Sequence, residues 1–230
     1  MRQIKLLGLA LMAVLSITGA MAAVASAEAT LPTILPEGTA VAPLTGTTKS
    51  GLSTFSPGAL KVESSKSEGS FSGTSKKLGT YDVLFLETQL AGEKCTGLKD
   101  TVEGSVLAPG TFHIRHYNLN GKLFTAEIFL VTELHFECGA ILFTVKGCVA
   151  GELTPNEEKL VTVLKVALKA EKNDNVPVKV LNEESTGEEN CELLAKQGAG
   201  AFALSTQVQT VELEGFKKSG SAVTVLVMPL

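Results

Sequence analysis

From about residue 80 onward, apolar and polar side chains alternate along the chain with a period of two. The segment from Tyr81 to Glu87 is rich in strand-forming residues. The alternation is clearest between Phe124 and Cys138, where the even positions are apolar: Phe124, Ala126, Ile128, Leu130, Leu134 and Phe136. Most odd positions are polar, with Phe129 and Val131 as exceptions. This pattern predicts a half-buried strand, or two strands that meet at a bend.

The turn before this segment is predicted from the match of apolar faces. A two-residue turn at 120–121 would set the apolar side chains of the preceding strand opposite largely polar positions. A three-residue loop over 119–121 instead pairs Phe112 with Ile128 and Ile114 with Ala126. Because burial of one face fixes the register of a strand pair, we predict the three-residue loop, with Gly121 in the left-handed conformation.

The rest of the chain continues the strand pattern. Between Leu160 and Ala170 a helix competes, since Leu160, Leu164 and Leu168 have helical spacing, but the β-branched residues favour a strand. Further strands are predicted near 178–181, 201–214 and 222–227, and a helical turn over 188–196. Many strands joined by Gly, Pro and Asn turns indicate an all-β fold. We predict an antiparallel β-sandwich or a barrel-like meander with long hairpins.

The first 27 residues have the pattern of a secretory signal peptide. Arg2 and Lys5 give a positive start, residues 6–18 are uncharged and apolar, and Ala25-Ser26-Ala27 matches a cleavage site. A bilayer span needs about 20 apolar residues, so we expect cleavage after Ala27, no membrane span afterwards, and a secreted protein. We assign residues 1–27 to the signal peptide, 28–50 to a lead-in rich in Pro, Thr and Gly, and 51–230 to a single β-rich domain.

Four cysteines follow the predicted cleavage site: Cys95, Cys138, Cys148 and Cys191. An even number in an exported protein indicates two disulfides. A strand from Cys138 to Cys148 would hold their Cα atoms about 30 Å apart, and a disulfide allows about 7 Å. That pair, and with it Cys95–Cys191, is therefore disfavoured. We favour Cys95–Cys138 with Cys148–Cys191, which closes two equal intervals; the remaining connectivity and reduced, buried thiols stay open.

Composition and charge exclude some classes of function. Hydrophobic residues make up 44% and charged residues 19% of the chain, as in a globular protein. The net charge of −4 becomes −6 without Arg2 and Lys5, and Arg115 is then the only arginine. A nucleic-acid partner and an arginine-based phosphate site are therefore not expected.

No motif for catalysis, a metal or a cofactor stands out. His113 and His116 are three residues apart and point to opposite faces of a strand, and neither they nor His135 have the spacing of metal ligands. Residues 69–73 resemble a nucleophile elbow, but Phe71 stands where the serine is required. The acidic residues between 183 and 192 are interpreted as a solvated loop. We predict no catalytic, metal-binding or cofactor-binding residue.

Several short motifs are similar to those of a known family. They are Cys95-Thr96-Gly97-Leu98, Gly110-Thr111-Phe112-His113, His135-Phe136-Glu137-Cys138 and the segment from Val145 to Gly151, with Leu31-Pro32-Thr33 near the start. In this order the chain resembles a family of secreted actinobacterial β-rich proteins of unknown function. The resemblance implies export and a β-rich fold, and it implies no catalytic residue.

These observations lead to three hypotheses about function. The first is an exported, non-enzymatic structural or binding protein of the cell surface or medium, whose partner is an unknown cell-envelope or extracellular ligand. The second is a secreted hydrolase with a site assembled from scattered Glu, His and Ser, which convergent polar groups in a deep pocket would favour. The third is a β-barrel carrier of a small apolar ligand, which a sheet closed around an apolar cavity would favour.

Overall fold

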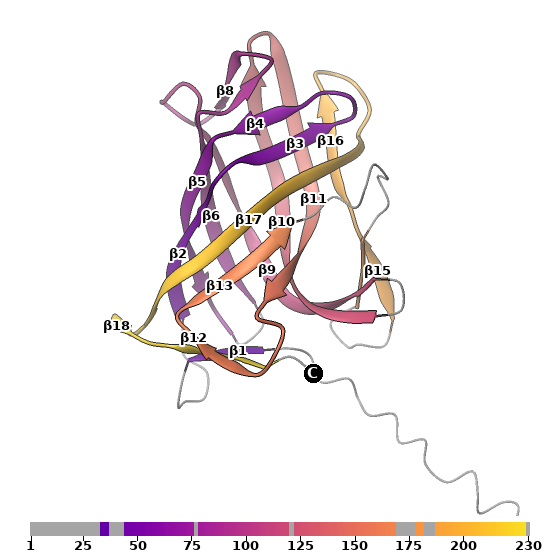
Figure 1. The fold of residues 1–230 in the computed structure, drawn as a ribbon. Coiled ribbons are helices and arrows are strands. Elements are labelled where there is room, and N and C mark those ends of the chain that lie inside the picture. The colour runs from indigo at the N-terminus through magenta and orange to yellow at the C-terminus, as the bar shows by residue number, and fades with distance from the viewer. Residues whose placement is uncertain are drawn as a thin grey trace, which may run out of the picture. The chain divides into compact units, whose positions relative to one another are not determined.

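The computed structural model describes residues 33–36, 44–75, 78–119, 122–168, 178–181 and 187–228. They fall within one compact unit, Leu31–Leu230, and form nineteen strands and no helix (Figure 1). The predicted all-β class is confirmed. The predicted signal peptide lies outside the described residues. In the ranges given above, no helix has the length and hydropathy needed to cross a membrane.

Eight antiparallel strands pair in a closed ring, which gives the fold its barrel-like form. Going round the ring, each strand pairs with the next, and the last pairs with the first. The strands are β2 (Leu44–Ser50), β5 (Lys66–Gly73), β6 (Leu78–Leu86), β9 (Val106–Leu119), β10 (Lys122–Cys138), β11 (Ile141–Thr154), β13 (Val163–Leu168) and β17 (Ala203–Lys218). The sheet thus begins inside the predicted lead-in, at Leu44.

Three long strands continue beyond this ring into a second one. There β10, β11 and β17 pair with five shorter strands: β3 (Ser53–Pro57), β4 (Val62–Ser64), β7 (Gln89–Leu90), β8 (Glu93–Gly97) and β16 (Leu193–Gln197). Figure 1 shows β17 crossing the molecule diagonally between the two groups of strands. We call the two groups the β2 ring and the β3 ring. Since they share three strands, their interiors are continuous.

A three-stranded sheet covers the core of the β2 ring. It consists of β1 (Thr33–Pro36), β19 (Val225–Met228) and β12 (Lys159–Val161). Val225 and Val227 of β19 are fully buried in the same cluster as the inward side chains of the ring. Outside the ring, β14 (Val178–Leu181) pairs with β9 and with β15 (Glu188–Cys191), and β18 (Ser221–Ala222) pairs with the end of β17.

The hairpin between β9 and β10 corrects the predicted turn. Leu119 pairs with Lys122, so two residues separate the strands, and Ile114 lies opposite Glu127. The predicted three-residue loop is therefore wrong. Its premise fails because both faces of this part of β10 are buried: Glu127 faces the ring interior, while Ala126 packs outside it in a small cluster with Val180 and Cys191. When both faces are covered, matching apolar positions no longer selects one register.

A β-bulge in β10 reverses which positions face inward. Val131 pairs with Gly147 and Leu134 with Val145, so β10 carries one more residue than β11 between these pairs. Gly147 has φ +106° there. Before the bulge the odd positions face the interior, and after it the even positions do, as Phe129 and Phe136 show by their membership of the two main core clusters. An extra residue of this kind shifts the alternation by one. Residues 124–138 therefore form one bulged strand.

The two ambiguous segments of the C-terminal half are both strands. The segment from Leu160 to Leu168 is strand and not helix, as favoured, but it forms two strands, β12 and β13, that belong to different sheets and are separated by Thr162. Residues 169–170 lie outside the described part. The helical turn predicted over 188–196 is wrong. Residues 188–191 pair with β14, and residues 193–197 pair with both β11 and β17. Ladder hydrogen bonds on both sides of β16 outweigh the local preference of Leu, Ala and Lys for a helix.

Gly110 of β9 allows the neighbouring strands β6 and β10 to approach closely inside the β2 ring. It pairs with Tyr81, whose hydroxyl donates to the Leu130 carbonyl at 3.4 Å. A Cβ on Gly110 would overlap both the Leu130 carbonyl oxygen and the Tyr81 ring. The missing side chain is thus what lets Tyr81 reach across β9 to β10.

Replacing Gly110 with alanine is expected to lower the free energy of unfolding by about 1–3 kcal/mol, because the backbone of β10 has to move. Gly51→Ala is the matched control, since nothing lies within 4 Å of its added Cβ. Urea denaturation of both variants measures the difference. Equal stability of the two variants would contradict the close packing described for Gly110.

Candidate functional site

The described interior contains an apolar cavity at the junction of the two rings. Its volume is about 110 Å³. Val83, Phe129 and Val211 line it from the cluster of the β2 ring, and Val62 and Phe136 line it from the cluster of the β3 ring. The cavity therefore lies where the two cores meet without filling the space between them.

Ala108 explains part of this space. It is buried and faces the interior from β9, yet it belongs to neither core cluster. Its inward neighbour on one side, Gly110, has its space filled by the Tyr81 ring. Ala108 carries only a methyl group and lines the cavity directly.

Hydroxyl and amide groups interrupt the apolar lining. Thr48 of β2 is only 4% exposed, and its Oγ1 has no hydrogen-bond partner. On β17, the Gln207 amide donates to Gln209 Oε1 at 3.4 Å. Ser64 and Thr88 share a hydrogen bond of 2.9 Å in the lining of the β3 ring. The cavity thus offers a few neutral hydrogen-bonding groups in an otherwise apolar wall.

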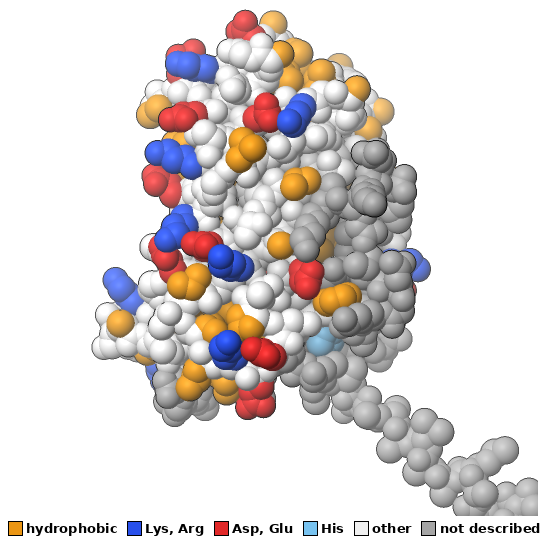
Figure 2. Space-filling view, viewed as in Figure 1, with side chains coloured by type: hydrophobic (Ala, Val, Ile, Leu, Met, Phe, Trp, Pro, Cys, Tyr) orange, Lys and Arg blue, Asp and Glu red, His pale blue; other side chains and the backbone are white. Residues whose placement is uncertain are grey.

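Charged side chains are placed on the outer face instead. None of the described residues that line the cavity is Asp, Glu, Lys or Arg. On the outside, Lys49 contacts Glu214 at 2.8 Å and Lys165 contacts Glu212 at 3.1 Å, across neighbouring strands. Figure 2 shows acidic and basic side chains interspersed over the face it presents. The strands therefore separate a charged exterior from a neutral interior.

Glu127 is the exception, a carboxyl group buried inside the β2 ring but outside the cavity lining. It is 2% exposed, its Oε2 has no hydrogen-bond partner, and it lies between Ile114 and Gly151 on the neighbouring strands. Burial raises the pKa of Glu127 to about 8. Burial, and to a lesser extent the nearby Glu127, also raises the pKa of Tyr81. Glu127 is therefore a protonated, neutral side chain at neutral pH.

The three histidines lie in three different surroundings. His116 is buried and pairs with Thr125 inside the β2 ring. His113 lies outside it, 3.2 Å from Arg115, which also forms an ion pair with Glu189 of β15. His135 is on the outer face of β10. Of the acidic residues between 183 and 192, those at 183 and 184 lie outside the described part of the chain.

His135 makes the contacts that most resemble a catalytic arrangement. Its Nδ1 lies 3.2 Å from Thr144 Oγ1, and its Nε2 lies 2.9 Å from Glu133 Oε1. Thr144, however, is 3% exposed and does not line the cavity, so a substrate could not reach its hydroxyl without displacing its neighbours. Within the described residues, no three His, Cys, Asp or Glu side chains come together in a way that could hold a metal ion.

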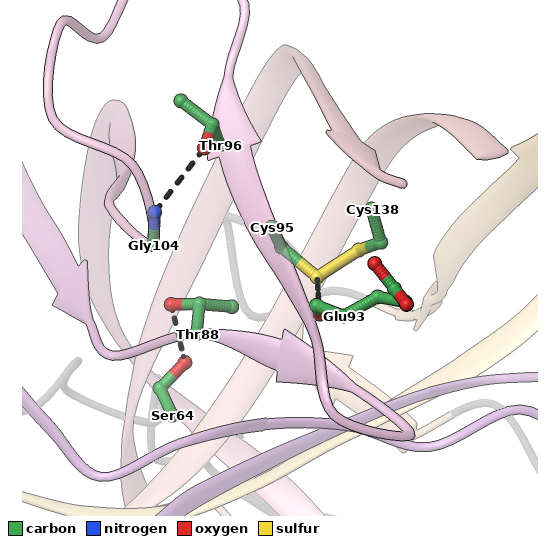
Figure 3. The surroundings of a disulfide bond; sticks show 7 residues. All are labelled: Ser64, Thr88, Glu93, Cys95, Thr96, Gly104 and Cys138. Carbon is green, nitrogen blue, oxygen red and sulfur yellow. Dashed lines mark hydrogen bonds between the residues drawn. A yellow bond between two sulfur atoms is a disulfide. The ribbon is translucent and has the colours of Figure 1, made fainter. Parts of the chain in front are cut away.

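The four cysteines lie in the pairs favoured by the sequence. Cys95 and Cys138 are opposite each other on β8 and β10, with a Cα–Cα distance of 4.0 Å, and both are buried in the β3-ring core (Figure 3). Cys148 and Cys191 join β11 to β15 with a Cα–Cα distance of 5.3 Å. The second disulfide fixes β15 to the outside of the sheet. Two disulfides are typical of proteins in oxidising compartments.

The sequence alone does not predict the cavity, but two of the lining residues stand out in it. Phe129 and Val131 were exceptions to the alternation of β10, and both line the cavity. Two large apolar residues in the wrong phase indicate that the inward face changes along the strand. Thr48, Gln207 and Gln209 carry no signal in the sequence, because isolated Thr and Gln residues in alternating segments are ordinary surface residues of a sheet.

No known protein family, curated protein or solved structure matches the chain. The resemblance to secreted actinobacterial proteins therefore stays a prediction.

Glu127 is expected to make stability fall as pH rises. The unfolded carboxyl loses its proton near its ordinary pKa of 4.5, whereas the folded one keeps it until about pH 8. The unfolding free energy of the wild type, relative to that of Glu127→Gln, should therefore fall by about 1.4 kcal/mol for each pH unit between these values. Denaturation at about pH 5, 6, 7 and 8 measures this decrease. Glu137→Gln, at an exposed position of the same strand, is the control; parallel curves for the wild type and Glu127→Gln would refute the assignment.

Peptide mapping without reduction is expected to give peptides that link Cys95 to Cys138 and Cys148 to Cys191. Replacing Cys148 and Cys191 together with alanine should lower the free energy of unfolding by about 2–4 kcal/mol, because the unfolded chain gains freedom. Denaturation under non-reducing conditions measures the loss. Any peptide that links Cys95 to Cys148 or Cys191 would contradict the described pairing.

Proposed function

We propose that this protein is an exported, non-enzymatic binding protein that holds a small apolar ligand inside its ring of strands. The observation that carries the proposal is the cavity at the junction of the two rings, which is lined mainly by apolar side chains from both cores. Small-molecule sites are characteristically concave and mostly apolar, with a small number of polar groups. The proposal joins the binding-protein hypothesis to the hypothesis of a β-barrel carrier.

The size of the cavity limits the ligand. A volume of about 110 Å³ is on the same order as the ~150 Å³ apolar cavity that stays dry and binds benzene in another protein. It is smaller than the roughly 300–1,000 Å³ typical of sites for drug-sized molecules. The ligand is therefore a compact molecule with a single ring or a short chain, and not a long acyl chain.

Export is part of the proposal. It is supported by the pattern of residues 1–27 and by the two disulfides, which persist in oxidising surroundings. Outside the cytoplasm, a protein with this cavity would bind its ligand in the medium or at the cell envelope. A hydrolase is less well supported, because the contacts of His135 lie away from the cavity and centre on a buried threonine.

Benzene at about ten times its dissociation constant is expected to stabilise the protein by about 1.4 kcal/mol, which raises the Tm by about 3–6 °C in a chain of this size. Ala108→Leu should abolish this increase, because the added carbon atoms occupy the cavity. Ala203→Leu makes the same change at an exposed position of β17 and should leave the increase unchanged. Thermal unfolding with and without benzene measures all three proteins.

The outcomes separate two causes of failure. If the wild type shows no increase in Tm with benzene, the cavity does not bind apolar molecules and the proposal is wrong. If Ala108→Leu is itself destabilised by about 1–3 kcal/mol, as overpacked cores are, the space beside Ala108 is not present in solution. Independently of these outcomes, mass spectrometry of protein purified under native conditions identifies any ligand that it carries.

A further inference from the structure

The polar groups of the cavity limit which functional groups the ligand can carry. The inference rests on the proposed function, since it concerns the same cavity. It begins from Thr48, which faces the interior from β2, is 4% exposed, lines the cavity and has no hydrogen-bond partner for its Oγ1. Buried hydroxyl groups are nearly always hydrogen-bonded, because leaving one without a partner is costly. A cavity beside such a group is a place where a ligand can supply the missing bond.

The sheet leaves room beside the Thr48 hydroxyl. Thr48 pairs with Leu213 on one side and with Gly69 on the other. A Cβ on Gly69 would lie 2.9 Å from Thr48 Oγ1, so the absence of a side chain at this position keeps the hydroxyl uncovered on that side. A threonine hydroxyl both donates and accepts. It can therefore donate to a carbonyl or accept from a hydroxyl group of a ligand.

The surroundings of this hydroxyl exclude a charged ligand. No Asp, Glu, Lys or Arg is among the described residues that line the cavity, and no histidine is among them either. A carboxylate or ammonium group placed there would lose its hydration without gaining an opposite charge, which is far more costly than burying a neutral hydroxyl. The remaining polar groups, such as Gln209 of β17, are also neutral.

We propose that the ligand is a small uncharged molecule with an apolar body and one hydroxyl or carbonyl group, and that this group forms a hydrogen bond with Thr48. The apolar body occupies the space lined by Ala108, Phe129 and Val145. Small neutral alcohols, phenols and ketones belong to this class, whereas fatty acids, amines and phosphate esters do not.

Three probes of similar size separate the effects of the apolar body, of a neutral hydroxyl group and of a charge on binding. Benzene has the apolar body alone, phenol adds a neutral hydroxyl, and benzoate carries a negative charge at neutral pH. The binding of each is measured by NMR titration of the wild type and of Thr48→Val, which replaces the hydroxyl with a methyl group. Thr48→Val should fold at least as stably as the wild type, because it removes a buried hydroxyl without a partner.

Thr125→Val is the matched control. The Thr125 Oγ1 is also buried and without a hydrogen-bond partner, but this residue does not line the cavity. It therefore undergoes the same chemical change in the same barrel-like fold at a position that the ligand does not contact.

Thr48→Val is expected to weaken phenol binding about threefold to tenfold, the effect of one hydrogen bond, and to leave benzene binding unchanged. Thr125→Val should change neither, and benzoate should not bind to the wild type. Phenol binding that is equal in the wild type and in Thr48→Val would overturn the inference, as would benzoate binding as tightly as phenol. If neither benzene nor phenol binds, the proposed function itself fails.

Discussion

The alternation of side chains along β10 is the constraint on which the rest of the structure depends. A strand shared by two rings has to present apolar side chains to both interiors, and the bulge between Val131 and Leu134 changes once which positions face inward, from Phe129 before it to Phe136 after it. The same shift places Val131 and Leu134 in the wall of the cavity. The bulge therefore decides which side chains of β10 line the cavity.

The fold class was predictable because the alternation is strong and covers most of the chain. The strand from Leu160, the long strand ending at Cys138 and the cysteine pairs all followed from local pattern or chain geometry. The register of β9 and β10 did not, because it depends on the cluster formed outside the ring by Ala126, Val180 and Cys191. Contacts between segments that are distant in sequence decided that register, and the segment 188–197 likewise became strand through its partners.

The candidate site was much less predictable than the fold. Its lining comes from separate strands, each contributing between one and four ordinary residues, and no spacing along the chain unites them. Phe129 and Val131 carried a signal as exceptions to a pattern, whereas Thr48 became notable only once its surroundings were known. Glu127 was also unpredictable from its residue type: a carboxyl group is expected on the outer face, and the structure buries it.

The position of β17 in the chain has a consequence for how the protein is made. This strand closes both rings, yet β2, which it pairs with, lies far earlier in the sequence: Lys49 and Glu214 are separated by 165 positions. While a ribosome is still synthesising the chain, β2, β3, β13 and β16 lack this shared partner, and their open edges can pair with other chains. Such long-range pairing also slows folding. The rings can therefore close only after the segment 203–218 has emerged.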